Sequence, residues 1–370
     1  MKQVSNKQQE VLDLYREGNT PAEIAKSLKK SVSTVYELLN RARRNFERAE
    51  VPIGQQLRGE SRLEDGDGNV KLRWIKSQRD AETIEDLMNA AMEGMRDKLP
   101  REKPVRLRTK NHYEDLLNLF ICTDYHLGGL SWAEETGADW DIKIAEELLI
   151  AWFKAALAQA PRAGIGVFAQ LGDFLHFDGL EAITPTGANI LEADTRFQKL
   201  VRVAIRVIRK VIEMMLQRYP KVVVLMCEGN HDLASSVWLR EWLTDIYRDE
   251  PRIIVDNAAQ PYYCYEHGKT ALFFHHGHKR GIKQLDTIFA AKFREVFGRT
   301  KFAYGHTGHL HSSDKAESNL MTIEQHRTLA AADAYSTRMG FTSGREASVI
   351  TYHKKYGRTG RVDITPEMVR

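Results

Sequence analysis

The sequence predicts an α/β domain preceded by a small all-α unit. From about residue 111 onward, short apolar segments alternate with long amphipathic helices, which is the pattern of a sheet covered by helices. Residues 5 to 48 instead show three short helical segments. The chain has 370 residues, of which 42% are hydrophobic and 28% are charged. This length and composition indicate a globular protein with more than one domain.

We divide the chain into a helical module (1–48), a connector (49–110) and a main domain (111–370). The formal charge of +4 is too small to indicate a polyanionic partner by itself. The three cysteines are far apart and are expected to be reduced and buried. No apolar run approaches the roughly 18 residues that span a bilayer, and the first residues are polar. We therefore expect a cytoplasmic protein of a bacterium or a phage-infected cell, without membrane contact; a homodimer stays open.

The helical module carries a recognisable motif. Its second helix opens with a capping box, Thr20 to Glu23, with proline at the first helical position, and its third helix begins near Ser33. The stretch from Ile24 to Leu39 resembles the helix-turn-helix of bacterial regulators and transposase-like proteins. The resemblance implies DNA binding, with bases facing Ser33, Thr34 and Tyr36, and phosphates near Lys29, Lys30, Arg41, Arg43 and Arg44. The alternative is a three-helix docking or dimerisation unit.

The connector contains a turn signal. Residues 65–68, Asp-Gly-Asp-Gly, separate two segments of strand character, 55–63 and 70–75, and predict a β-hairpin. An amphipathic helix is expected from about 81 to 95. The basic run 101–110 follows Pro100 and contains Pro104, and we interpret it as a solvated linker.

In the main domain, five apolar strands each end in side chains that can bind a metal ion. The strands are expected at 117–123, 165–171, 221–228, 270–274 and 302–304. They are followed by Asp124-Tyr125-His126, Gly172-Asp173, Gly229-Asn230-His231-Asp232, His275-His276-Gly277-His278 and Gly305-His306-Thr307-Gly308-His309-Leu310-His311. In open α/β sheets the ligand site lies beyond the carboxyl ends of the strands. Nine of the thirteen histidines belong to these segments or to His176 close by, so we expect one shared site.

The residue types indicate the kind of metal. Carboxylates, imidazoles and one amide, without thiolates, suit divalent ions such as manganese, iron or zinc. Each motif alone could be a helix cap or a turn. The ordered set of five, each after an apolar strand, favours a metal site over coincidence.

These five motifs resemble those of the calcineurin-like metallophosphoesterase superfamily, over about residues 115–315. The resemblance implies a two-sheet β-sandwich flanked by helices and two divalent ions, with manganese expected and iron, zinc or magnesium as alternatives. It implies one ion on Asp124, His126, Asp173 and His311, and the other on Asp173, Asn230, His276 and His309. Asp173 would bridge the ions, and a hydroxide between them would attack the phosphorus. His231 would face the substrate, oriented by Asp232.

Three histidines compete with these assignments. His275 and His278 are alternatives to His276, which is preferred because the family pattern is His-Gly. His306 is an alternative to His309, which has a second histidine two residues on. We expect the three competitors to be packing or supporting residues.

The substrate is expected to be DNA. His176, three residues after Asp173, resembles a histidine of the superfamily's double-strand-break repair nucleases that faces the scissile phosphate; a stacking or capping role is the alternative. Arg196 could clamp a backbone phosphate, or be solvated while Asp194 or Thr195 caps the helix that follows. The arrangement also resembles phage-encoded phosphoesterases with a terminase-like helix-turn-helix. The alternatives are a general phosphodiesterase or phosphatase docked by its first module, and a non-catalytic DNA-binding protein.

The segment after residue 311 carries three further strand signals. They are 321–329, 348–352 and a final strand after the turn 356–360. We expect them to complete the second sheet.

Overall fold

The structure is a computed structural model that describes residues 10–11, 13–14, 21–28, 30, 34–35, 38, 55–64, 70–79, 104–108, 113–185 and 189–369. The chain divides into two compact units, Met1–Met88 and Asn89–Arg370, and each is described by itself. The predicted boundaries at residues 48 and 110 stay predictions.

The first unit contains a small helical core and a hairpin. Helix α2 (Pro21–Ser27) begins at the predicted proline, and its Ile24 and Ala25 are buried against Val11 and Val35. Strands β1 (Gln55–Glu64) and β2 (Val70–Arg79) pair antiparallel, which confirms the predicted hairpin. The apolar positions of the three predicted helical segments therefore face one another.

Few of the predicted DNA-binding residues can be placed. Thr34 is helical and exposed, and Lys30 is half-buried. Lys29, Ser33, Tyr36, Arg41, Arg43 and Arg44 lie outside the described residues, as does the predicted helix 81–95. DNA contact by this module stays a prediction.

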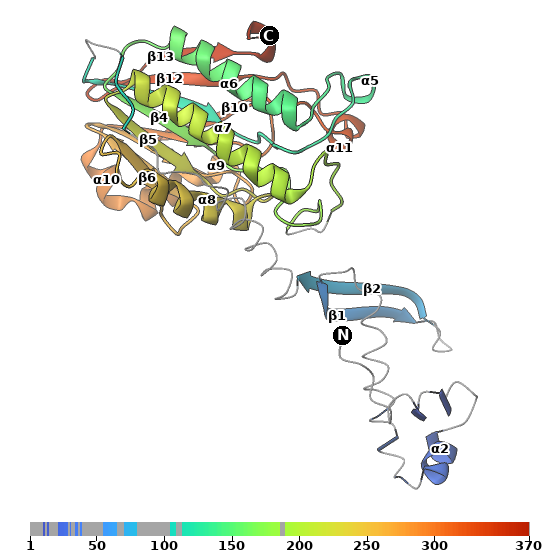
Figure 1. Cartoon of the computed structure of the whole chain (residues 1–370). Coiled ribbons are helices and arrows are strands. Elements are labelled where there is room, and N and C mark those ends of the chain that lie inside the picture. The colour runs from blue at the N-terminus through green and yellow to red at the C-terminus, as the bar shows by residue number, and fades with distance from the viewer. Residues whose placement is uncertain are drawn as a thin grey trace. The chain divides into compact units, whose positions relative to one another are not determined.

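The second unit is an α/β fold with two sheets flanked by helices, as predicted (Figure 1). The larger sheet has six strands in the order β13-β12-β3-β4-β5-β6. Its strands β3 to β6 are parallel, and β12 and β13 extend it antiparallel. Their bounds are β3 Leu116–Cys122, β4 Ile165–Gln170, β5 Lys221–Met226, β6 Ile253–Asp256, β12 Ala347–His353 and β13 Gly357–Ile364.

The smaller sheet has five strands in the order β10-β11-β9-β8-β7. Strands β8, β9 and β11 are parallel, so their carboxyl ends lie at one edge. The bounds are β7 Tyr263–His267, β8 Thr270–Phe274, β9 Phe302–Thr307, β10 Asp314–Glu317 and β11 Thr322–Gln325. All five strands predicted to lead into ligands are therefore present.

Helices cover the outer faces of both sheets. Helices α6 (Ile142–Gln159) and α7 (Phe197–Arg218) lie on the six-stranded sheet, and α9 (Ile282–Lys292) packs on the five-stranded sheet (Figure 1). The other elements are α5 Ala133–Thr136, α8 Leu233–Ile246, α10 Arg294–Arg299, α11 Ala334–Arg338 and the 3₁₀ turn η2 Pro366–Met368. No helix among the residues described is both long and apolar enough to cross a membrane.

Alternation along the strands builds the two apolar layers. In β8, Leu272 and Phe274 face the core between the sheets, while Ala271 and Phe273 face α9. Leu119 of β3 lies in the same core between the sheets. Successive side chains of a strand point to opposite faces, so a strand buried on both faces is continuously apolar, as these are.

Two expectations about the chain's path are wrong. Strands β12 and β13 do not complete the second sheet; they extend the sheet that contains β3. Of the three predicted late strands, β11 alone belongs to the five-stranded sheet, where it pairs with β9. The described part of the predicted solvated linker, residues 104–108, lies against the domain: the Val105 N–H donates to Glu250, and the Arg108 N–H donates to the Gln217 carbonyl. Both depend on contacts between residues distant in the sequence.

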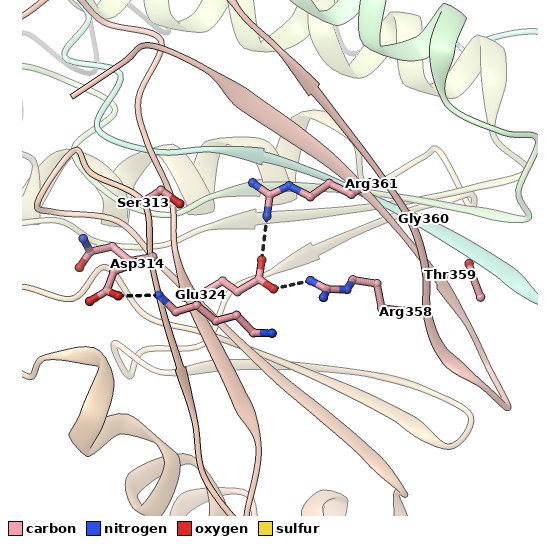
Figure 2. Close-up of a pocket in the computed structure, with 9 residues that line it drawn as sticks. Ser313, Asp314, Glu324, Arg358, Thr359, Gly360 and Arg361 are labelled. Atoms are coloured by element: carbon pink, nitrogen blue, oxygen red, sulfur yellow. Dashed lines mark hydrogen bonds and ion pairs between the residues drawn. The ribbon is translucent and has the colours of Figure 1, made fainter.

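A charged cluster joins the two sheets at their open edge. Glu324 of β11 is 6% exposed and accepts hydrogen bonds from Arg358 and Arg361 of β13 (Figure 2). The Arg361 Nη1 to Glu324 Oε2 distance is 2.9 Å. A cavity of about 490 Å³ lies beside this cluster. One carboxylate therefore pairs with two guanidinium groups from the opposite sheet.

We expect Glu324→Gln to lower the free energy of unfolding by about 2 kcal/mol, because two guanidinium groups lose their buried partner. The loss stays below that for a fully buried pair, because both arginines are about a third exposed and can regain water. Urea unfolding measures the effect. Glu295→Gln is the control, since Glu295 is 94% exposed and 4.0 Å from Arg299. Equal stability of both variants and the wild type would contradict a stabilising role of the cluster.

Candidate metal centre

The five predicted ligand segments meet at one edge of the two sheets. Three groups of side chains hold potential ligand atoms within 4.8 Å of one another. They are Asp124, His126 and His311; Asp124, Asp173, His276 and His309; and His126, His176 and His231. Asn230 adjoins the second group, since its Oδ1 lies 3.1 Å from the His276 Nε2. All seven predicted metal ligands are thus close together.

The first group surrounds a buried carboxylate. The His311 Nε2 lies 3.2 Å from the Asp124 Oδ1 and 3.3 Å from the His126 Nε2. The other oxygen, Asp124 Oδ2, accepts hydrogen bonds from the Thr123 hydroxyl at 2.6 Å and the His309 N–H at 2.8 Å. These two donors fix the position of Oδ2, and the other oxygen, Oδ1, therefore faces His311.

The second group has the same design. The Asp173 Oδ2 lies 3.0 Å from the His276 Nε2, and the Asp173 Oδ1 accepts the His231 N–H at 2.8 Å. Asp124 belongs to both groups and is the carboxylate that they share in this geometry. The bridging role of Asp173 stays a prediction.

The tautomer of His276 favours this residue over His275 and His278 as the metal-binding histidine of the segment. Its Nδ1 lies 2.9 Å from the Leu171 carbonyl oxygen, which can only accept, so Nδ1 carries the proton. The Nε2 then faces the Asp173 and Asn230 oxygens and is the ring atom that would bind a metal ion. A carbonyl that fixes the ring in this way is typical of metal-binding histidines.

The competing histidines lie outside the three groups. The His275 Nδ1 accepts the Gly277 N–H, and its ring stacks on Tyr262 at 4.6 Å. His306 is buried in a hydrogen-bonded chain, with its Nδ1 2.9 Å from His326 and its Nε2 3.0 Å from the Tyr352 hydroxyl. His306 and His275 are therefore packing residues, as expected. His278 stacks beside His275 at 5.6 Å.

The backbone is strained at the ligands. Among the described residues, five that are not glycine have a positive φ: Asp124 (49°), His126 (46°), Asp173 (53°), His309 (75°) and His311 (53°). All five are predicted metal ligands. A side chain in this region costs about 1 kcal/mol or more, and such residues concentrate at functional sites. Because the strained residues are predicted ligands, we infer that their backbone conformation serves the site rather than the stability of the fold.

The residues present fit divalent cations. Asp124 is fully buried and Asp173 is 2% exposed, and the ion pairs that the structure shows for them are with histidines rather than with lysine or arginine. Apart from its ion pair with His311, the Asp124 Oδ1 has no hydrogen-bond partner among the described residues. A buried carboxylate oxygen in this state is costly, and oxygen and imidazole donors in this arrangement satisfy a cation.

The charges around His276 support this fit. Burial lowers the pKa of His276, but Asp173 and Asp124 outweigh it and raise that pKa to about 9. Without a cation, a proton on His276 is what balances the two carboxylates. The same carboxylates in a loaded site would face a metal ion, to which His276 binds in its neutral form.

His126 and His176 are neutral imidazoles. Burial, with the adjacent His231, lowers the pKa of His126 well below its ordinary value and that of His176 to about 4. The His176 Nδ1 lies 3.3 Å from the His126 Nδ1, and its ring stacks against His231 at 5.7 Å. His176 is therefore within the site, beside a predicted ligand, and its contact with a phosphate stays a prediction.

The predicted support of His231 by Asp232 is wrong. The Asp232 carboxylate accepts N–H groups of the main chain, from Asp173, Phe174, Leu175 and Gly229. The His231 Nδ1 instead lies 2.8 Å from the His176 carbonyl oxygen, to which it donates. Asp232 thus holds the strained turn that carries Asp173, and the His176 carbonyl orients His231.

Some supporting residues had little sequence signal. The Thr328 hydroxyl donates to the Asp124 carbonyl at 2.7 Å from 204 positions away. Asp178 accepts the N–H groups of Ala234 and Ser235 at the start of α8, which follows the Asn230 motif. The sequence shows Thr123 only as the residue before Asp124 and does not indicate that its hydroxyl donates to the Asp124 carboxylate. Such partners are set by the fold rather than by a local pattern.

The expected cap of helix α7 is also wrong. Arg196 is the N-cap residue of α7 and is exposed, without a capping bond from its side chain. Asp194 caps a different helix, since its Oδ2 accepts the Ile142 N–H at the start of α6. A phosphate contact by Arg196 stays a prediction.

No protein-family model and no curated protein sequence matches the chain. Solved structures similar to it include the phosphoesterase YfcE from E. coli, with 13% identity, a TM-score of 0.31, and coverage of 66% of this chain and 98% of that one. A novel archaeal phosphodiesterase has 12% identity, a TM-score of 0.34, and coverage of 67% and 99%. Vps29 from Entamoeba histolytica, complexed with zinc, has 10% identity, a TM-score of 0.30, and coverage of 66% and 98%. Likeness at this level carries no conclusion about activity.

Proposed function

We propose that the chain is a metal-dependent hydrolase of phosphoesters, and that its substrate is DNA. The observation that carries the proposal is that, in the described part of the chain, the only residues other than glycine with a positive φ are five predicted ligands that meet at one sheet edge. We assign the chain on the same ground to the calcineurin-like metallophosphoesterases, whose five motifs it resembles in order.

The residues would hold two divalent cations. Asp124, His126 and His311 would form one site; Asp173, Asn230, His276 and His309 would form the other, with Asp124 or Asp173 shared. Bound divalent cations neutralise the charge of phosphate oxygens and favour deprotonation of water. Manganese is the ion we propose; iron, zinc and magnesium accept the same donors.

The residues of the chain supply positioning and a proton. Because the His231 Nδ1–H is held by the His176 carbonyl, its Nε2 is the atom left to face a substrate. When protonated there, it can donate to the leaving oxygen of the ester. Neutral His176, stacked on His231, adds a second imidazole that does not repel this charge. Asp232 keeps Asp173 in its strained turn throughout.

The choice of DNA rests on two features. His176 lies in the site at the position that resembles the superfamily's repair nucleases. The first unit places Val11, Ile24 and Val35 in a helical core, as a helix-turn-helix requires. Such a module would raise the local concentration of DNA at the hydrolytic site. The alternative is a general phosphodiesterase whose first module binds another partner.

The test uses the full chain after removal of metal with a chelator. We expect two ions per chain to rebind, and hydrolysis of bis(p-nitrophenyl) phosphate, single-stranded DNA and duplex DNA only after manganese, iron, zinc or magnesium is restored. Failure to hydrolyse any phosphoester with any of these ions would overturn the proposed hydrolase. Turnover of the small diester without cleavage of either DNA would overturn the proposed substrate.

A further inference from the structure

Four exposed apolar side chains lie on segments that contact the first ligand group or contain its members. Leu130, Trp132, Leu310 and Tyr335, here called the rim patch, are 44%, 59%, 64% and 66% exposed. Large apolar side chains in contact with water cost free energy, and several together mark a binding surface. We therefore expect the rim patch to be covered by a binding partner.

Hydrogen bonds tie Trp132 to the metal centre. Ser131, just before it, pairs through both main-chain groups with Trp140, at 2.9 and 3.0 Å. The Trp140 indole N–H in turn donates to the carbonyl of the ligand His126 at 3.3 Å. Trp132 itself begins helix α5, whose first turn bonds to its carbonyl. Trp132 therefore directly follows Ser131, whose partner Trp140 contacts the predicted ligand His126.

Leu310 and Tyr335 lie around the same group. Leu310 stands between the ligands His309 and His311. Tyr335 belongs to α11, which follows the segment anchored by the bond from Thr328 to Asp124. Helices α5 and α11 lie side by side in Figure 1, and the Arg338 to Glu135 ion pair of 3.0 Å joins them. The two aromatic residues therefore lie at neighbouring helices, and segments next to these helices contact the site.

The loop beside the second ligand group is basic. Lys279 and Arg280 follow directly after His276-Gly277-His278 and are exposed, and Lys283 is exposed at the start of α9. Segments next to His126 and His311 therefore carry exposed apolar and aromatic residues, and the segment after His276 carries exposed basic residues.

We propose that the rim patch binds nucleobases of a single-stranded or unwound DNA strand, while Lys279 and Arg280 bind its phosphates. This inference rests on the proposed function and names the form of its substrate. Each phosphate of a strand is flanked by two bases, so a phosphate held at the ligand groups would place neighbouring bases toward the segments that carry the rim patch. Exposed aromatic rings beside a cationic path are how single strands are bound without sequence preference. In duplex DNA the base faces are covered by stacking and cannot reach Trp132 and Tyr335.

The test compares kcat/KM for oligothymidylate with kcat/KM for bis(p-nitrophenyl) phosphate, using the full chain loaded with manganese. Trp132→Ala and Tyr335→Ala should each lower the ratio of the two values about tenfold, because each loses one stacked base. Trp132→Phe should restore most of the ratio, whereas Trp132→Leu should not, because leucine is apolar but has no planar face. Tyr113→Ala is the control, since Tyr113 is 64% exposed and lies outside the rim patch.

A second measurement follows the salt dependence. Lys279→Gln with Arg280→Gln should reduce the slope of log KM for oligothymidylate against log salt by about 1.4, the value for two phosphate contacts on a single strand. An unchanged substrate ratio in both aromatic variants would overturn the inference, and so would full restoration by Trp132→Leu, which indicates an apolar partner such as a protein. If wild-type protein hydrolyses neither substrate, the proposed function fails instead.

Discussion

Replacing Asp173 with asparagine is expected to lower kcat/KM for phosphodiesters at least about a thousandfold, equivalent to about 4 kcal/mol. The side chain is 2% exposed and contacts the His276 Nε2 through one oxygen and the His231 N–H through the other. Asparagine has the same shape but one oxygen fewer, so its amide N–H group must face one of these nitrogen atoms. It also removes the charge that a cation would balance. We expect the variant to bind fewer than two ions, as measured by metal analysis.

Asp178→Asn is the matched control. Asp178 is equally buried, at 2% exposure, but it accepts main-chain N–H groups at the start of α8. Loss of that cap should cost about 1 kcal/mol of stability and leave both ions bound. Full activity and two ions in Asp173→Asn would contradict the role of Asp173 as a ligand. Equal metal loss in both variants would show that the site responds to any lost buried carboxylate.

The meeting of the predicted ligands at one place could be predicted because it depends on two local patterns. A strand buried on both faces is a largely apolar run, and the predicted ligand is the first charged residue after it, as with Asp124 after β3 and Asp173 after β4. Parallel strands then bring these ends to one edge. The structure adds what the pattern cannot contain, namely the positive φ of both residues.

The role of Asp232 could not be predicted, because a Gly-Asn-His-Asp motif does not show which partner its last carboxylate finds. Asp232 and His231 are adjacent, but the Asp232 oxygens meet the turn at Asp173 to Leu175, more than fifty positions earlier. Likewise, an antiparallel strand such as β12 can join either sheet with the same alternation. Its pairing with β3 rather than β11 is decided by packing over the whole domain.

The rim patch illustrates a third limit. Trp132 and Tyr335 lie on helices of four and five residues, too short to give a periodic signal. In the sequence, an exposed tryptophan cannot be told from a buried one such as Trp152. Only the fold brings both residues to neighbouring helices beside segments that contact the candidate metal centre.

Gly229→Ala is expected to lower kcat/KM more than a hundredfold and the free energy of unfolding by about 3 kcal/mol. A Cβ atom on Gly229 would lie 1.9 Å from the Asp173 Oδ1 and 2.2 Å from the Asp173 main-chain N. Side chains can rotate away from a new methyl group, but this main-chain nitrogen belongs to a strained turn held by Asp232. The methyl group must therefore separate the Asn230 segment from Asp173.

Gly298→Ala separates this effect from glycine replacement in general. Gly298 lies in helix α10, and a Cβ there meets nothing within 4 Å, so alanine should raise stability by about 0.5–1 kcal/mol and leave activity unchanged. Urea unfolding and diester kinetics, with metal analysis, measure both variants. A Gly229→Ala protein with normal activity would mean that the approach of the two ligand segments is not required. Since Asp173 and Asn230 follow different strands, the close contact at Gly229 is what would allow both to bind the one cation proposed for them.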